Sequence, residues 1–387
     1  MFSHTYFSTM NLFIMASLSF ISCSSSLELQ SCDDLHEAVD MVMLENVNVT
    51  MHPFADIICD KFTTFTLSDY NLNIMSSNDD PNHTFHGNAN FQNVRFEVVN
   101  GANLTFSTDI LFETHEDNDD IRDINGGAFY IGKGSSVRFF SNFETRNIGV
   151  RSETEESSDF ADHQNDGGCI WNNGYFRVDG SAIMSNCKNQ GGGESSPGRG
   201  GAIFNDVEGS VLFSNGVEIS DVRLTDDEGN DGGGFYNFGK VVIKGPSSFF
   251  DLRAESAGAI YNALDAVFKF KDDATALFYK CRAFDGYGGA IINSGLFKFS
   301  GPALFISGSA DYKGSQIVVG SSGLMKIKKN SYFFDNTCSE PNCSTIWVEE
   351  GGELKYSKTT QFVNSVSGYD EILCEGVYFE DGEVCFN

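Results

Sequence analysis

The hexapeptide GGAIFN at residues 200–205 is one copy of a sequence motif that is repeated along the chain. Full copies stand at 126–131, 167–172, 232–237, 257–262 and 288–293, and shorter copies begin at Gly314 and Cys343. Successive copies start 41, 33, 32, 25, 31, 26 and 29 residues apart. A shortest period near 25 residues, lengthened by insertions, indicates a solenoid.

Each repeat contains three short runs with strand patterning. After the motif strand at 288–293 come the alternating run 296–299, a turn at 300–302 and a third run at 303–306. Apolar residues at every second position are typical of half-buried strands, and the repeats contain no amphipathic run long enough for a helix. The sequence therefore predicts an all-β fold: a single-stranded, right-handed parallel β-helix with three strands per coil.

The motif residues have separate structural roles. The paired glycines mark a corner that needs positive φ or close approach to the neighbouring coil, and the third residue, usually Ala, points into a narrow interior. Asn occupies the sixth place in five successive copies, where its amide can bond to the next Asn along the axis. The alternative is that these residues only end their strands. They are Asn172, Asn205, Asn237, Asn262 and Asn293.

The GGA[I/F]xN phrase, followed by a Phe-x-x-Asn-like third strand, resembles the repeats of the chlamydial polymorphic outer-membrane proteins. It is also similar to the wider pectin-lyase-like β-helix superfamily. The resemblance covers roughly residues 87–370. It implies the fold strongly and an activity only weakly, because such folds carry many functions.

Both ends of the chain differ from the repeats. Residues 1–26 contain an apolar run at 12–21 followed by small residues, which is typical of a secretory signal peptide. Residues 27–86 should form an N-terminal cap and the first irregular coils. A helix over 31–42, N-capped by Ser31, would cover the apolar end of the solenoid. The repeats then occupy 87–370, and 371–387 form a C-terminal cap.

Cysteines and glycosylation sequons indicate an oxidising compartment outside the cell. The four sequons are at Asn48, Asn82, Asn103 and Asn342, and the chain has 10 Cys. We expect the end caps to be stapled by Cys32 with Cys59, Cys338 with Cys343, and Cys374 with Cys385. We expect Cys169, Cys187 and Cys281 to be reduced, buried fillers. No pair of cysteines has zinc-like spacing with a His.

Four insertions precede consecutive motif copies, at 114–125, 149–166, 190–199 and 224–231. Because equivalent positions stack in a solenoid, these insertions should lie on one side. We predict a binding surface on the first and last of them, at Asp117, Asp119, Asp120, Asp226, Asp227, Glu228 and Asp231. It would bind a cation, Ca²⁺ being the expected one, or a cationic or neutral glycan or protein. Alternatively, the charge only keeps the chain soluble at a net charge of −29. The negative charge disfavours nucleic acid and anionic membranes.

Two classes of function remain. The first is a secreted or cell-surface β-helix that binds or adheres without catalysis, and no cofactor other than possible Ca²⁺ is implied. The second is a polysaccharide lyase or glycoside hydrolase of the kind the resemblance suggests. Hydrolases of that kind combine Asn-x-Asp, Asp-Asp, Gly-His-Gly and Arg-x-Lys on one face. Here the Asp-Asp pairs are present, but Gly-His-Gly and Arg-x-Lys are absent. The first class is therefore favoured.

Overall fold

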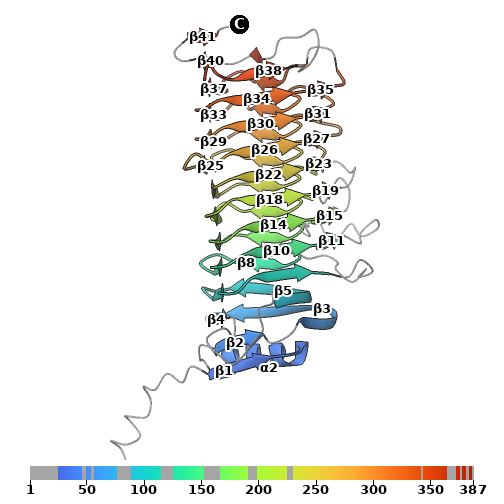
Figure 1. Cartoon of the computed structure of the whole chain (residues 1–387), viewed down its shortest axis with the longest axis vertical. Helices are drawn as coiled ribbons and strands as arrows, with labels where there is room; N and C mark the ends of the chain where they lie inside the picture. Colours follow the sequence, from blue (N-terminus) through green and yellow to red (C-terminus); the bar gives the residue numbers. More distant parts are fainter. Residues whose placement is uncertain are drawn as a thin grey trace, which may run out of the picture.

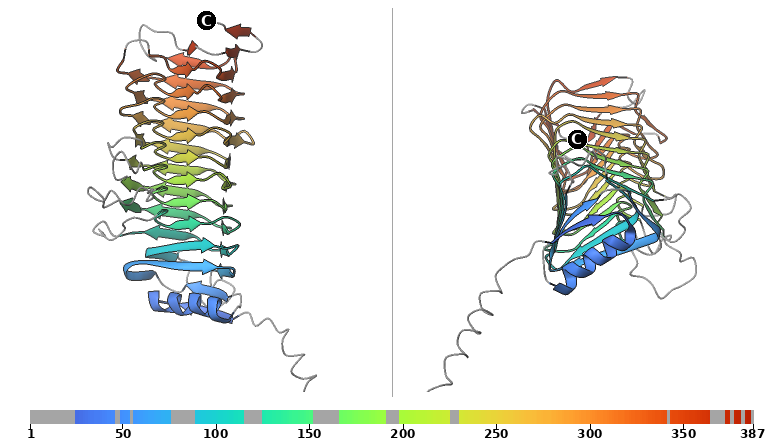
Figure 2. Two further views of the ribbon diagram at one scale, coloured as in Figure 1. Left: turned by 180° about the vertical axis from the view of Figure 1, so that it is seen from behind. Right: turned by 60° about the horizontal axis from the view of Figure 1, so that its bottom comes forward.

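The computed structural model is an elongated parallel β-solenoid with one helix at its N-terminal end (Figure 1). The structure describes residues 25–45, 49–53, 56–75, 89–114, 125–151, 166–190, 198–224, 230–340, 343–363, 372–374, 377–380 and 383–385. Successive coils lie one above the other along a single axis, as the two further views show (Figure 2). The predicted all-β β-helix with a capping helix is therefore confirmed.

The coils stack their strands into four columns, each hydrogen-bonded in parallel register along the axis. The motif stack contains β8 (Phe129–Ile131), β12 (Ile170–Asn172), β16 (Ile203–Asn205), β20 (Phe235–Asn237), β24 (Ile260–Asn262), β28 (Ile291–Asn293), β32 (Ile317–Val319), β36 (Ile346–Val348) and β39 (Ile372–Cys374). The third stack contains β7 (Ile110–Glu113), β10 (Phe143–Arg146), β14 (Ala182–Ser185), β18 (Val217–Ser220), β22 (Ser247–Phe250), β26 (Ala276–Tyr279), β30 (Ala303–Ile306), β34 (Ser331–Phe334) and β38 (Gln361–Val363).

The second stack lies between these two along the chain. It contains β1 (Ser25–Leu29), β2 (Val49–Pro53), β4 (Asn71–Ile74), β6 (Asn103–Phe106), β9 (Ser136–Phe139), β13 (Tyr175–Val178), β17 (Ser210–Phe213), β21 (Lys240–Lys244), β25 (Val267–Lys271), β29 (Leu296–Phe299), β33 (Leu324–Ile327), β37 (Glu353–Tyr356) and β40 (Val377–Glu380), with β41 (Glu383–Cys385) antiparallel to β40. Two long strands, β3 (Ile57–Ser68) and β5 (Ala89–Val99), pair with each other, and β5 also pairs with β7 and β8. The motif and third stacks are therefore one continuous sheet at this end.

The sequence predicts three strands per coil, but the structure has a fourth stack, made of very short strands. It contains β11 (Gly149–Arg151), β15 (Lys188–Gln190), β19 (Arg223–Leu224), β23 (Arg253–Ala254), β27 (Arg282–Ala283), β31 (Ser309–Ala310) and β35 (Thr337–Cys338). Two residues separate each of these strands from the third strand of its coil. The first of the two has φ between 49° and 56° in every coil: Asn147, Asn186, Asp221, Asp251, Lys280, Ser307 and Asp335. Strands of two or three residues are too short to show alternation, so the pattern missed them.

The motif glycines make the corner that the sequence predicts. Gly200 has φ +68°, and a Cβ on Gly201 would stand 2.4 Å from the carbonyl oxygen of Gly233 in the next coil. The fifth copy shows that the first place tolerates another residue, because Ala257 adopts φ +54° there. In the full copies the second glycine lets the coils touch backbone to backbone at this corner, whereas Ser315 and Ser344 take this place in the two shorter copies.

Phenylalanine rings stacked along the axis fill the interior. Phe278 is fully buried and lies 4.7 Å, centroid to centroid, from both Phe249 and Phe305, and Phe333 continues the stack 4.6 Å beyond Phe305. Each ring stands at the same register position of its coil, so a repeated Phe buries a whole column of apolar surface.

The N-terminal helix α2 (Cys32–Glu45) covers the open end of the solenoid. Ser31 Oγ accepts a hydrogen bond from Asp34 N at 3.2 Å, and Asp34 accepts one from Gln30 N at 2.9 Å, which lowers the pKa of Asp34. Leu35 and Ala38 are buried, and α2 packs on β3. The predicted cap is therefore present. β1 begins at Ser25, within the predicted signal segment, and residues 1–24 lie outside the described part of the chain.

Candidate functional site

Most of the predicted binding residues lie outside the described part of the chain. This applies to Asp117, Asp119, Asp120, Asp226, Asp227 and Glu228. Asp231 is described, and it forms a parallel bridge with Ser256 of the next coil. The described ends of the insertions therefore have to define the site.

Those ends stack in register at one corner of the solenoid. On the departing side, Arg151 pairs with Gln190, and Asn189 pairs with Leu224. On the returning side, Gly126 N donates to Asp166 O at 3.1 Å, Gly167 N to Arg199 O at 2.9 Å and Gly200 N to Asp231 O at 3.0 Å. The second, third and fourth insertions each follow a strand of the fourth stack. All four insertions end immediately before the motif glycines.

The returning ends form a column of alternating charge on adjacent coils, Asp166, Arg199 and Asp231, which we call the charge column. Arg199 donates to Asp166 through Nη2 at 2.7 Å to Oδ2 and through Nε at 3.1 Å to Oδ1. Asp166 is buried. A bidentate pair of this kind fixes the orientation of both side chains.

Both carboxyl groups in the charge column take up a proton more readily than an exposed Asp. Burial raises the pKa of Asp166 to about 6, although its hydrogen bonds from Arg199 act in the opposite direction. Burial, and then the nearby Glu255, raises the pKa of Asp231 to about 7, and Arg199 only partly offsets this. These two groups change charge near neutral pH, which is unusual for surface carboxylates.

Beside the charge column, the fifth motif position places a row of aromatic rings on the outer side of the motif stack. Tyr130 and Trp171 stack with centroids 4.3 Å apart at 3°, and Tyr236 and Tyr261 stack 4.5 Å apart at 7°. Phe204 lies between these pairs, 5.8 Å from Tyr236. The guanidinium of Arg199 lies 4.9 Å from the Phe204 ring centre. Sugars bind to the open faces of aromatic rings, and here the faces contact one another, so the row serves packing rather than ligand binding.

Behind the aromatic row, the five motif asparagines form the expected ladder. Each Nδ2 donates to the Oδ1 of the next Asn at 2.7 Å, from Asn172 through Asn205, Asn237 and Asn262 to Asn293. All five side chains are fully buried. Asn293 Nδ2 has no hydrogen-bond partner within the described residues, and the next rung is Val319. The ladder is structural and pins the register of the motif stack.

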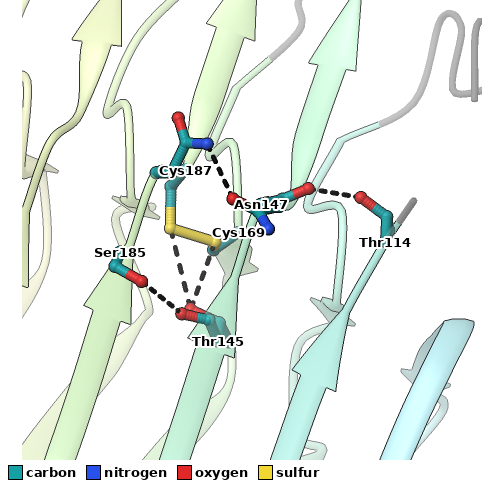
Figure 3. Close-up of a disulfide and its surroundings, with 7 residues drawn as sticks. Thr114, Thr145, Asn147, Cys169, Ser185 and Cys187 are labelled. Atoms are coloured by element: carbon teal, nitrogen blue, oxygen red, sulfur yellow. Dashed lines mark hydrogen bonds between the residues drawn. A yellow bond between two sulfur atoms is a disulfide. The ribbon is translucent and has the colours of Figure 1, made fainter. Parts of the chain in front are cut away.

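A disulfide between Cys169 and Cys187 contradicts the expectation that both are reduced fillers (Figure 3). Cys169 takes the third motif place, and Cys187 directly precedes β15, so the bond spans the corner where the insertions leave and return. The Thr145 hydroxyl lies 3.4 Å from Cys169 Sγ. In the next coil the same two places hold Ala202 and Val222. Two cysteines at places that meet across one corner of the same coil are the sequence signal for this disulfide, and the sequence analysis did not use it.

The other cysteines follow the sequence prediction where they are described. Cys32–Cys59 and Cys338–Cys343 are disulfides, and Cys281 is a buried free thiol whose pKa is raised by burial. The side chains of Cys374 and Cys385 lie outside the described set. So do the sequons at Asn48, Asn82 and Asn342, whereas Asn103 is exposed at the start of β6, where its Nδ2 donates to Asn71 Oδ1 at 2.6 Å.

Within the described residues, no group of three or more His, Cys, Asp or Glu is arranged to hold a metal ion. In the same residues no helix is long and apolar enough to cross a membrane. No family model matches the chain, and no curated protein or solved structure shows significant similarity to it.

Proposed function

We propose that the protein is a secreted or cell-surface, non-catalytic β-helix whose partner binds to the acidic insertions. The observation that carries the proposal is the stacking of the insertion ends at one corner, from Asn125 to Asp231. Loops that start and end in register on a rigid rod present their charges together to one partner. The partner is a cation, Ca²⁺ first, or a cationic or neutral glycan or protein.

Three further features support a location outside the cell. The described residues contain three disulfides, which persist in oxidising compartments. Residues 1–26 have the pattern of a signal peptide, and Asn103 is the exposed Asn of an Asn-x-Thr sequon. The resemblance to chlamydial outer-membrane repeats accords with an adhesive role at a surface, on fold-level analogy.

A polysaccharide lyase or hydrolase is the second candidate, because two carboxyl groups in the charge column have raised pKa values. Asp166 and Asp231 are two coils apart, about 10 Å at the spacing of neighbouring strands. That is close to the carboxyl separation of inverting glycosidases. However, the Arg199 side chain occupies the coil between them and binds Asp166. The position of a sugar between two catalytic carboxyls is thus filled by the protein, which favours the non-catalytic function.

The proposal is tested by calorimetric titration of Ca²⁺ into the purified chain. We expect binding in the wild type and its loss in the variant D226N/D227N/E228Q. The matched control D335N/E340Q/E350Q removes three exposed carboxylates outside the insertions and should bind as the wild type does. Incubation with pectate and alginate should release no unsaturated uronate absorbance. Steady product release, abolished by D166N or D231N, would replace this proposal with the enzyme.

A further inference from the structure

The lysines of this acidic protein are concentrated in its C-terminal coils. Residues 240–358 carry 14 Lys and Arg against 12 Asp and Glu, whereas the rest of the chain carries 11 against 42. The C-terminal coils are thus close to neutral, with a formal charge of +2, while the remainder carries −31. Charge partition on this scale creates separate electrostatic surfaces on one molecule.

Four of these lysines stack directly above one another on the outer face of the second stack. Lys269 of β25 pairs with Lys298 of β29, Lys298 with Lys326 of β33, and Lys326 with Lys355 of β37. We call these four residues the lysine ladder. Neighbours in a ladder are about 4.8 Å apart, and strand alternation directs all four side chains outward between buried neighbours such as Phe297 and Phe299.

Two further lysines, two coils apart with Ser300 in the coil between them, add positive charge beside the lysine ladder. Lys271 and Lys328 directly follow Phe270 and Ile327, so they flank the ladder on the same edge, and both are exposed. Partial burial and then the repulsion of Lys328 and Lys269 lower the pKa of Lys298. Like charges opposite each other across strands destabilise a sheet. The fold therefore holds these ammonium groups together at some cost.

At the same register position in the N-terminal coils, the positive charges are neutralised by a carboxylate. The fold therefore does not require a column of lysines without acidic partners. There, Arg138 and Arg177 both bind Asp179, at 2.8 Å and 2.7 Å. In the C-terminal coils Lys355 binds Glu353 at 2.6 Å. Within the described residues no carboxylate lies within ion-pair distance of Lys269, Lys298 or Lys326. Three adjacent rungs therefore present uncompensated charge to solvent.

The shape of the face selects among polyanions. The outward residues of β25, β29 and β33 include Val267, Leu296 and Leu324 but no aromatic side chain, so the face lacks a stacking platform for single-stranded nucleic acid. None of these strands exposes a large hydrophobic side chain for insertion into a bilayer. A straight row of evenly spaced charges matches an extended chain that carries one or more anionic groups per sugar ring.

From this geometry we propose that the lysine ladder, with Lys271 and Lys328, binds a linear polyanionic glycan laid along the axis of the solenoid. Sulfate and carboxylate groups offer the same charge complementarity to ammonium groups, so both sulfated and uronate chains belong to this ligand class. The site is distinct from the acidic insertions. Figure 1 shows β25, β29, β33 and β37 along one edge of the rod, and the fourth stack, from which most insertions leave, along the opposite edge.

The test measures binding of the full chain to heparin, as the sulfated probe, and to polygalacturonate, as the uronate probe, over a range of salt concentrations. The variant K269Q/K298Q/K326Q should lose at least tenfold in affinity for the preferred probe. The slope of log affinity against log salt should become shallower by roughly two to three, since each neutralised contact contributes about 0.7–0.9 on charged polymers. Preference for heparin identifies a sulfated ligand, and preference for polygalacturonate a uronate ligand.

Two control variants separate the ladder from net charge and from folding. The variant K61Q/K133Q/K188Q removes three exposed lysines elsewhere and should bind as the wild type does, and K269R/K298R/K326R should retain binding. Because the glutamine triple variant removes repulsion, its thermal midpoint should equal or exceed that of the wild type. The proposal is overturned if neither glycan binds the wild type, if both glutamine triples lose affinity equally, or if single-stranded DNA or anionic vesicles bind through the ladder and the glycans do not.

Discussion

The coils from β8 to β19 and those from β22 to β37 share one backbone plan and differ in what they add to it. The first group carries the insertions, the Cys169–Cys187 disulfide and paired charges such as Asp166 with Arg199. The second has short turns, parallel stacks of Phe rings and the lysine ladder. The comparison shows that one backbone plan accommodates different buried and outward side chains in its two halves.

The sixth motif place shows that a single buried column can also change its chemistry along the axis. Asn172 to Asn293 form the hydrogen-bonded ladder, and Val319 and Val348 continue the column with apolar side chains. The backbone pairing passes without interruption from β28 to β32. A polar ladder and an apolar stack are therefore interchangeable solutions for the same position, provided that each column segment is internally consistent.

The largest predicted effect is in the C-terminal ring stack. Replacing Phe278 by Ala removes a fully buried ring between Phe249 and Phe305 and should cost about 3–5 kcal/mol. Hydrogen exchange of amides in β22 to β30 measures the local opening free energy, which is the appropriate quantity for a repeat protein. Leu277→Ala, on the outer side of the same strand, should cost less than half as much. Equal effects would contradict the assignment of inner and outer faces.

The disulfide should matter mainly in the N-terminal coils. Replacing Cys169 and Cys187 by Ala and Val, as in the neighbouring coil, should destabilise β12 to β16 by about 2–4 kcal/mol. Exchange in β28 to β36 should not change, because coils interact chiefly with their neighbours. Cys281→Ala is the control without a disulfide. Alkylation of the unfolded, unreduced chain should label Cys281 and leave Cys169 and Cys187 unlabelled.

The interior and the end of the asparagine ladder should respond differently. Asn237→Val breaks two 2.7 Å hydrogen bonds, to Asn205 and to Asn262, and leaves the polar groups of both without this partner. The loss of stability should be about 1–3 kcal/mol. Asn293→Val breaks one bond and also removes a buried donor that has no partner in the described residues, so it should cost less. Exchange rates in β20 and β28 measure both changes. A larger loss for Asn293→Val would show that the end of the ladder has a role the hydrogen bonds do not reveal.

The smallest predicted effect is a pH dependence at the charge column. A carboxyl whose pKa is raised on folding binds its proton more tightly in the folded state, so it destabilises the fold as pH rises from about 4 through about 7. Asp231→Asn should remove this contribution and gain about 1 kcal/mol at pH 8 relative to pH 5, reduced by partial exposure. Difference melting curves against the wild type measure it. Asp335→Asn, at an exposed carboxylate outside the charge column, is the control variant.

The features that the sequence predicts correctly are those that depend on the repeat or on local capping rules. The motif Asn column and the cap helix followed from periodicity and capping rules, since each depends on residues close in sequence or equivalent between coils. The Cys169–Cys187 bond was missed because the corner partner of the third motif place is set by β15, a strand too short to predict. The lysine ladder was missed because register between coils determines which lysines are neighbours. The four lysines of the ladder are 29, 28 and 29 residues apart in the sequence. They become neighbours only through the strand register between successive coils.

The central claim is that the molecule presents two independent surfaces of opposite charge. Its most direct test is Ca²⁺ calorimetry on three proteins side by side: the wild type, D226N/D227N/E228Q and K269Q/K298Q/K326Q. We expect the insertion variant to lose the binding heat and the ladder variant to retain the wild-type affinity within about twofold, since charges beyond a Debye length of about 8–10 Å are largely screened. Binding heat that survives in the insertion variant, or disappears in the ladder variant, would contradict it.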